Sequence, residues 1–472
     1  MKNNRRFYLL ILVISISLIL GFKLRNRNYN EVPFPGESLD EYSNSWVGLS
    51  LIQFGFPVGQ SGLAGYPITD NRYINVDRIY QGMANGNTLQ MNYPWFDHPP
   101  MMGLISGGYS YIKGARVFED TTTATIRKPI ILMSVVTIGL TSILAYLIFG
   151  WKTAVVSSLV MATSPLMVIN GRMVQAENGI TPLFLLLMIC LWFYKKIRKR
   201  YLLVLCAFLS GMAVLFKLSG VALIFSGVLV LLTDNKRGLS VRLSEGLIFL
   251  TVSLSIAFLF VVYGAAIDFD VFVSVFFSNT NRAYGIGLNA ISELITSTKV
   301  TSSKFLGDGW PLIGWLGLFL LIGKKEIISK SRFVWIPILV YLSVYLFFGS
   351  ESYGWYRIPF MPFLMIIVSW LIVRFSQNIK ETFLSVFALL IPIGINVSRL
   401  TEAHQIPLLI STWRFTTLIA IGMAIVLGVV YKPGKKLTIL IYILMFLLFM
   451  AAIYTNILRT DMLSVEYWYK AH

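Results

Sequence analysis

The sequence is poor in cysteine and lacks the common motifs of soluble enzymes. Only two of the 472 residues are cysteine, Cys190 and Cys206, and both lie in apolar stretches where cysteine usually packs as a small apolar side chain. This spacing allows neither a disulfide framework nor a CxxC metal motif. The sequence also has no glycine-rich phosphate loop, no GxSxG motif and no HExxH motif. A soluble nucleotide donor is therefore not expected.

Charged residues are scarce as well, at 13% of the chain, whereas 56% of the residues are hydrophobic and the mean hydropathy is +0.70. A soluble globular protein does not need so much apolar surface, so the composition predicts a polytopic membrane protein. A net charge of +18 on a soluble protein would suggest nucleic acid binding. Here the basic excess lies in short loops between apolar segments, which is a topology pattern, so we expect a lipid bilayer and no nucleic acid as partner.

Windows of about 20 apolar residues predict an all-α fold with about thirteen transmembrane helices. The first span, 7–22, is expected to remain uncleaved because no small-residue cleavage site follows it. Basic loops after the fourth, sixth, eighth and twelfth spans fall on the side of the N-terminus, which is therefore predicted to be cytoplasmic. The other spans are expected at roughly 129–149, 153–170, 178–194, 201–216, 218–233, 245–265, 311–323, 333–349, 358–373, 382–398, 415–431 and 437–456.

Two long segments, 23–126 and 266–310, are predicted to lie on the outer face of a plasma membrane. The first is too long for a simple connector, and its many aromatic residues favour a folded region with amphipathic helices at the membrane surface. Most acidic residues also fall on this face, so we expect an active site there. The motif-bearing region is predicted to be 1–375, and 376–472 adds transmembrane helices without recognised motifs.

The first outer segment contains two adjacent carboxylates, Asp40 and Glu41. Ser38 and Glu41 have the spacing of a capping box at a helix start, and Tyr42 and Trp46 follow at helical spacing. Glu41 is therefore either a capping residue or a functional one. Asp40 is not needed for the capping box, and an ionised carboxylate held at a membrane surface could act as a general base.

The end of the same segment carries Asp97 and His98, followed by two prolines that stiffen the chain. One interpretation is a turn anchored at the membrane interface, and the other is a contact from His98 to a phosphate or a substrate hydroxyl. An Asp-His pair is only a weak indication of a metal site, because a metal needs further ligands. A divalent metal is therefore left open.

Five further polar residues are candidates for substrate binding. Arg172 and Glu177 lie in a short polar turn between two spans and are expected to face a cavity. Lys217 interrupts two apolar runs, where it either snorkels or lines a site. Arg357 follows Tyr356 in an aromatic stretch typical of the membrane interface, and its guanidinium could bind a phosphate in bidentate fashion.

Four motifs in a fixed order resemble those of the GT-C glycosyltransferases, in particular the group with the protein O-mannosyltransferases and the lipid A aminoarabinose transferase. They are Asp40-Glu41, the Asp-His-Pro-Pro stretch at 97–100, Arg172 with an acid five residues later, and Tyr356-Arg357 before a proline-containing span. The resemblance covers 1–375. It implies a GT-C-like fold, a polyprenyl-phosphate-linked sugar donor, a hydroxyl acceptor on a protein, lipid or glycan, and inversion at the anomeric carbon.

The resemblance also implies roles for individual residues. Asp40 would be the catalytic base and Glu41 its acidic neighbour. His98 would stand where some relatives place a basic residue on the donor phosphate, Glu177 would take the second acidic position, and Arg357 would stabilise the leaving phosphate. Relatives differ in their metal dependence, so no cofactor is predicted.

Two functions of other classes remain open from the sequence. A flippase or transporter of lipid-linked saccharides would need ionisable residues at mid-span depth, and the predicted spans contain few of them. A non-catalytic membrane scaffold that binds a partner through its outer segments would tolerate single substitutions of Asp40, Glu177 or Arg357.

Overall fold

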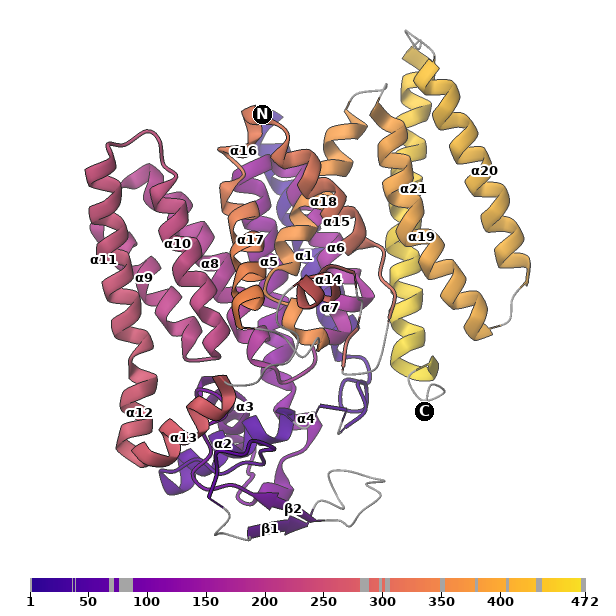
Figure 1. The fold of residues 1–472 in the computed structure, drawn as a ribbon. Helices are drawn as coiled ribbons and strands as arrows, with labels where there is room; N and C mark the ends of the chain where they lie inside the picture. Colours follow the sequence, from indigo (N-terminus) through magenta and orange to yellow (C-terminus); the bar gives the residue numbers. More distant parts are fainter. Residues whose placement is uncertain are drawn as a thin grey trace.

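The structure is a computed structural model and it is almost entirely helical, as predicted (Figure 1). One short antiparallel hairpin interrupts the helices, in which β1 (Arg72–Asn75) pairs with β2 (Thr88–Met91). The structure describes residues 2–35, 37–38, 40–67, 72–75, 88–280, 288–296, 299–301, 306–348, 353–377, 381–404, 407–429 and 435–467.

The long helices form a bundle of three neighbouring groups (Figure 1). The central group consists of α1 (Lys2–Asn26), α5 (Lys128–Phe149), α6 (Trp151–Thr163), α8 (Ala176–Ile197), α15 (Trp310–Ile322), α17 (Arg332–Phe348) and α18 (Met361–Ser376). On one side lie α9 (Arg200–Val214), α10 (Val221–Leu232), α11 (Leu239–Ala257) and α12 (Leu259–Ile267). On the other side lie α19 (Thr382–His404), α20 (Pro407–Val429) and α21 (Lys435–Met462).

Apolar length identifies the parts of this bundle that can cross a membrane. In the described part of the chain, six stretches are long and apolar enough: Arg6–Asn26, Thr123–Phe149, Ala176–Ile197, Leu239–Ile267, Leu384–Glu402 and Thr438–Val465. Six more apolar helices are shorter: Arg200–Val214, Leu218–Leu232, Phe269–Thr280, Trp310–Ile322, Arg332–Phe347 and Met361–Ser376. The polytopic membrane architecture is confirmed, although only half of these twelve segments have the full length of a span.

The predicted span 153–170 is not a continuous helix. The segment expected at 153–170 breaks at Ser164, so α6 is followed by a separate short helix, α7 (Pro165–Asn170). Pro165 has no backbone N–H and fits the first position of a helix, and the Ser164 hydroxyl accepts from the backbone N–H of Met167 at 3.4 Å. Hydropathy does not detect this break because both helices are apolar.

The described part of the first segment predicted to be outer, 23–126, folds at the end of the bundle opposite the N-terminus (Figure 1). Its two main helices, α2 (Asp40–Phe54) and α3 (Met101–Ile112), pack closely because glycines line their contact. A Cβ atom added at Gly48 would lie only 1.8 Å from the carbonyl oxygen of Gly103. A short turn, η1 (Phe118–Asp120), and a short helix, α4 (Thr123–Ile126), lead from there into α5.

The described part of the second segment predicted to be outer, 266–310, packs against the first. It contains α13 (Phe269–Thr280) and α14 (Leu288–Thr296). The Ser274 hydroxyl on α13 donates to the Gly65 carbonyl at 2.8 Å, and Asn279 donates to the Asp97 carbonyl at 2.9 Å. The remaining short elements are α16 (Lys325–Ile328), η2 (Leu218–Gly220), η3 (Gly354–Arg357) and the π turn η5 (Leu463–Tyr467).

Candidate active site

A buried ion pair joins two of the predicted site residues. Lys217 Nζ lies 2.7 Å from Glu177 Oε1, and the Glu177 side chain is fully buried while that of Lys217 is 14% exposed. Glu177 lies in the first turn of α8, where the helix dipole favours a negative charge. Its second oxygen, Oε2, has no hydrogen-bond partner among the described residues. The pair therefore retains an acceptor for a ligand hydroxyl.

One aromatic ring contacts the lysine of this pair, and two further tyrosines pack behind that ring. Lys217 Nζ lies 4.5 Å from the centre of the Tyr356 ring, which is the geometry of a cation–π contact. The Tyr356 ring lies 5.2 Å from that of Tyr345 on α17, and the Tyr345 hydroxyl is 3.2 Å from that of Tyr341 one turn earlier. These rings reduce the contact of the ion pair with water, which strengthens its electrostatic interactions.

Arg357 follows Tyr356 in the same turn, η3, and has unused donors. Its Nη1 donates to the Lys299 carbonyl at 3.1 Å, whereas Nε and Nη2 have no hydrogen-bond partner in the described part of the chain. Burial lowers the pKa of Arg357 to about 10, so the guanidinium stays protonated at neutral pH. Nε and Nη2 form one edge of the guanidinium, the edge that binds a carboxylate or phosphate with two parallel hydrogen bonds.

The carboxylate of Glu41 does not cap α2, so the predicted capping box is wrong. Instead, Glu41 forms a bidentate ion pair with Arg127: Nε donates to Oε2 and Nη2 to Oε1, both at 2.8 Å. The side chains of this pair are 2% and 0% exposed, and Arg127 was not among the predicted site residues. The Ser38 hydroxyl accepts from the side-chain amide of Gln175 at 2.5 Å. Asp40, at the start of α2, is only half-buried.

The turn that precedes α8 is tied to the start of α2. The backbone N–H of Val174 donates to Glu41 Oε2 at 3.2 Å, next to the bond between Gln175 and Ser38. Because Glu177 follows directly in α8, these bonds fix the start of α2, with Asp40, relative to the Glu177–Lys217 pair.

Arg172 does not face a cavity, contrary to the prediction. Its side chain is fully buried, and its guanidinium donates to the carbonyls of Leu24 and Val32 at 2.7 and 3.1 Å and to the Ser464 hydroxyl at 2.8 Å. Burial, with the positive charge of Arg127 nearby, lowers the pKa of Arg172 to about 9. The short polar turn points inward because its carbonyl and hydroxyl partners lie inside the bundle.

Asp97 and His98 lie at the base of the first outer segment. Asp97 accepts hydrogen bonds from Ser61 Oγ and from the Tyr66 hydroxyl, both at 2.6 Å. Burial and the Asp97 carboxylate together raise the pKa of Tyr66 well above its usual value. The His98 ring packs edge-on against Trp95, with ring centres 6.0 Å apart.

The stretch with His98 is attached to the chain just before Lys217. The backbone N–H of Met101, at the start of α3, donates to the Leu215 carbonyl at 3.2 Å. Among the described residues, no group of three or more His, Cys, Asp or Glu side chains is placed to hold a metal ion.

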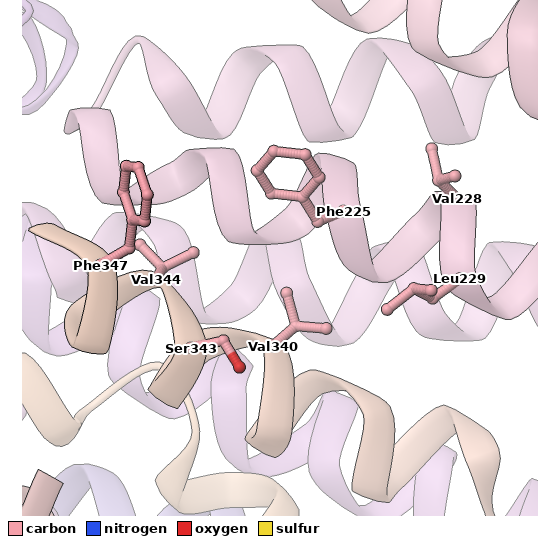
Figure 2. A pocket seen from close by; sticks show the side chains of 7 residues that line it. All are labelled: Phe225, Val228, Leu229, Val340, Ser343, Val344 and Phe347. Carbon is pink, nitrogen blue, oxygen red and sulfur yellow. The ribbon is translucent and has the colours of Figure 1, made fainter. Parts of the chain in front are cut away.

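An apolar cavity of about 480 Å³ lies between α10 and α17. Figure 2 shows Phe225 on α10 and Phe347 on α17 projecting to the same side of the two helices. Lys217 precedes α10 by four residues, and Tyr345 lies next to Val344 on α17, so the chain segments around the ion pair continue into the two helices that line the cavity. Its lining residues are Phe225, Val228, Leu229, Val340, Ser343, Val344 and Phe347.

The structure thus brings together Glu177, Lys217 and Tyr356, with Arg357 next to them, and holds Asp40 and Glu41 close by through the turn before α8. Arg127 could not be singled out from the sequence as the partner of Glu41. The available signal was an arginine at the end of a predicted span in a chain with few acidic residues, which favours an ion pair. The cavity and the two tyrosines of α17 carried no recognisable sequence pattern.

Comparison with known proteins adds independent information. The family model of dolichyl-phosphate-mannose-protein mannosyltransferases matches residues 97–263, and no curated protein sequence matches the chain. The chain is similar to the solved structure of ArnT from Cupriavidus metallidurans bound to undecaprenyl phosphate. The two sequences are 15% identical and the TM-score is 0.57, and the match covers 96% of this chain and 77% of that chain.

Two further solved structures share the architecture. The archaeal oligosaccharyltransferase AglB from Archaeoglobus fulgidus, in complex with an inhibitory peptide and a dolichol-phosphate, is 12% identical, with a TM-score of 0.52 over 98% of this chain and 57% of that chain. The arabinosyltransferase EmbB from Mycobacterium smegmatis is 11% identical, with a TM-score of 0.54 over 96% and 41% of the two chains. At these identities the likeness concerns the fold, and it extends over nearly the whole chain.

Proposed function

Because the chain has the fold of the GT-C glycosyltransferases, we propose that it is an integral-membrane inverting glycosyltransferase. Its donor would be a sugar linked to polyprenyl phosphate, and its acceptor a hydroxyl group on a protein, lipid or glycan. One observation carries this proposal: a largely buried cation, Lys217, lies in a cluster of polar groups four residues before α10, the helix that forms one wall of an apolar cavity. A lipid phosphate has the same combination of an apolar chain and a charged head.

The cavity between α10 and α17 suits the isoprenoid chain. Its lining consists of aliphatic and aromatic side chains apart from Ser343, and Phe347 and Phe225 remain 79% and 50% exposed at its edge. In a bilayer, such a surface is open to lipid tails, so an isoprenoid chain can pack against it by van der Waals contact without leaving the apolar phase. The donor phosphate would then lie beside Lys217 and against the free edge of Arg357.

The reaction follows from the groups that surround this position. Asp40 would take the proton of the acceptor hydroxyl while the hydroxyl oxygen attacks the anomeric carbon from the face opposite the phosphate. The new C–O bond forms as the bond between the anomeric carbon and the phosphate oxygen breaks, and polyprenyl phosphate leaves with that electron pair. Lys217 and Arg357 would stabilise the charge that develops on the leaving phosphate.

The remaining predicted residues fit supporting roles in this scheme. Glu177 would orient Lys217, and its second carboxylate oxygen, Oε2, could accept a hydrogen bond from a sugar hydroxyl. Glu41 and Arg172 are engaged by internal partners, so we assign them to positioning. Asp97 would fix its own stretch of chain through its hydrogen bond with Tyr66. His98, the next residue, would thereby be held near the donor.

The proposed orientation follows from the charges at the two ends of the bundle. Arg198 pairs with Asp234 at 2.5 Å, and Arg332 donates to the Thr233 carbonyl, so basic loops from three parts of the chain meet at one end. Cytoplasmic loops are enriched in such residues. We therefore assign that end and the N-terminus to the cytoplasm, and the active site to the outer face of a plasma membrane.

Donor consumption in membranes tests this function. Membranes that contain wild-type protein, Asp40→Asn or Asp461→Asn would be incubated with radiolabelled polyprenyl-phosphate sugars, beginning with mannose, the sugar named by the matching family. We expect wild type and Asp461→Asn to consume donor and Asp40→Asn to be at least about 100-fold slower, as for loss of a general base. Wild-type rates in Asp40→Asn would refute the role of this residue. Movement of labelled lipid across the bilayer without consumption would support a flippase instead.

A further inference from the structure

The π turn η5, which follows α21 directly, touches the turn that positions the candidate active site. Arg172 Nη2 donates to Ser464 Oγ at 2.8 Å, and the Ser464 hydroxyl in turn donates to the Thr460 carbonyl at 2.8 Å. Ser464 and Thr460 are 0% and 1% exposed, so these bonds form away from water. The contact joins parts of the chain that are 292 residues apart. It brings Ser464, in a part of the chain without a recognised motif, to the back of the site.

Arg172 depends on neutral acceptors for its interactions. Its guanidinium is fully buried and bonds two backbone carbonyls and one hydroxyl, while its Nε has no hydrogen-bond partner within the described residues. A buried charge without a full set of acceptors is costly, so each of these bonds matters for where the side chain lies. Ser464 supplies the one side-chain acceptor in this set.

The position of Arg172 affects both Asp40 and Glu177, because both are connected to it through the next few residues of the chain. Two residues later, the Val174 N–H donates to Glu41 Oε2, and the Gln175 side chain donates to Ser38. The first bond fixes the start of α2, which carries Asp40. The same turn leads into α8, whose first turn carries Glu177. A shift of the turn would therefore move the proposed base relative to the proposed phosphate site.

More bonds hold the end of α21 and the adjoining turn η5 against this region. Asn28 donates to the Ser464 carbonyl at 3.0 Å, Asn456 donates to Thr163 Oγ1 at 3.2 Å, and Arg459 donates to the Gly307 carbonyl. The last turns of α21 are thus fixed to three separate parts of the core. Such anchoring gives Ser464 a defined place from which to hold Arg172.

We propose that Ser464 is a positioning residue, which acts through Arg172 to set the distance between Asp40 and the Glu177–Lys217 pair. This inference rests on the proposed function for its kinetic consequence, but its structural part is independent of it. Geometry errors of about 1 Å cost on the order of 100-fold in rate, so a partial shift is expected to lower kcat by roughly tenfold. The KM for the donor should change little, because the cavity and Lys217 remain in place.

The test uses the full-length protein in lipid nanodiscs, with Ser464→Ala, Ser464→Thr and the control Asp461→Asn. Asp461 lies three residues away in the exposed ion pair with Arg27, whose side chains are 45% and 51% exposed, so its loss should have no effect. Two measurements are made: hydrogen–deuterium exchange of the segment 171–178, and the kinetics of transfer from the polyprenyl-phosphate sugars that wild type consumes. The exchange measurement needs no enzymatic activity.

We expect Ser464→Ala to exchange the Val174 amide at least about fivefold faster and to lower kcat with an unchanged KM, and Ser464→Thr to restore both. Unchanged exchange and kcat in Ser464→Ala would overturn the proposal. A loss of activity that Ser464→Thr does not rescue, together with a lower unfolding temperature, would overturn it in favour of a purely structural role. Faster exchange in Ser464→Ala with no transfer by wild type would support the positioning contact and contradict the glycosyltransferase function.

Discussion

Substituting Lys217 with methionine leaves the buried carboxylate of Glu177 without its partner. At the observed separation of 2.7 Å, an effective dielectric constant of about 20 gives an attraction of about 6 kcal/mol. Desolvation of both groups offsets part of it. Because 14% of the lysine side chain is exposed, we expect a net loss of about 3 kcal/mol, the lower end for breaking a buried pair.

The double variant Glu177→Gln/Lys217→Met separates stability from function. It leaves no unpaired charge, so its stability should return to within about 1 kcal/mol of wild type. Transfer should not return, because the cation that we assign to the donor phosphate is missing. The hydrogen bond from Lys217 to the donor phosphate should contribute about 1.5–3 kcal/mol. Its loss should therefore lower kcat/KM by roughly 10- to 100-fold.

Two assays on the same purified proteins measure these effects: thermal unfolding followed by intrinsic fluorescence, and donor consumption at several donor concentrations. Lys152→Met is the matched control, because Lys152 is exposed and its ammonium lies 5.9 Å from the Trp151 ring. A double variant as unstable as Lys217→Met would contradict the assignment of the stability to the ion pair. A wild-type kcat/KM in the double variant would contradict the phosphate contact.

Two other predictions concern the cavity and the outer segment. Val344→Trp should fill the cavity and raise the KM for a long-chain donor severalfold, because the isoprenoid chain loses its van der Waals packing against α10 and α17. A short-chain donor, and the outward-facing control Leu339→Trp, should show no such rise. Gly48→Ala should destabilise the protein by about 1–3 kcal/mol because its Cβ would lie 1.8 Å from the oxygen of Gly103, measured as a lower unfolding temperature. Gly108→Ala, with only Ile52 at 3.4 Å, is its control, and equal unfolding temperatures would contradict the close packing.

Local sequence patterns predicted the class of the protein and several of its elements. Hydropathy identified a polytopic membrane protein, and helical spacing around Tyr42 and Trp46 predicted the helix that the structure shows as α2. The order of four short motifs was sufficient to suggest the GT-C fold, which the comparisons confirm. These features depend on residues near one another in the sequence, or on composition, and no knowledge of the packing is needed for them.

The partners of the charged groups could not be predicted in this way. Glu41 had the spacing of a capping box, yet it pairs with Arg127, 86 residues away, because a bidentate pair satisfies both buried charges. Arg172 was expected in a cavity, but it binds carbonyls and Ser464 inside the bundle. In each case, burial makes the partner essential, and burial is known only after the helices have packed.

The sequence by itself therefore determined the membrane-embedded helical class, the candidate residues and their resemblance to a family, because apolar length, helical period and motif order are properties of the linear chain. The tertiary structure alone decided which candidates meet. Glu177 and Lys217 are 40 residues apart and Arg172 and Ser464 are 292 apart, and each pair comes into contact only when the ends of separate helices converge. Electrostatic energy depends on distance and burial, and neither follows from spacing along the chain.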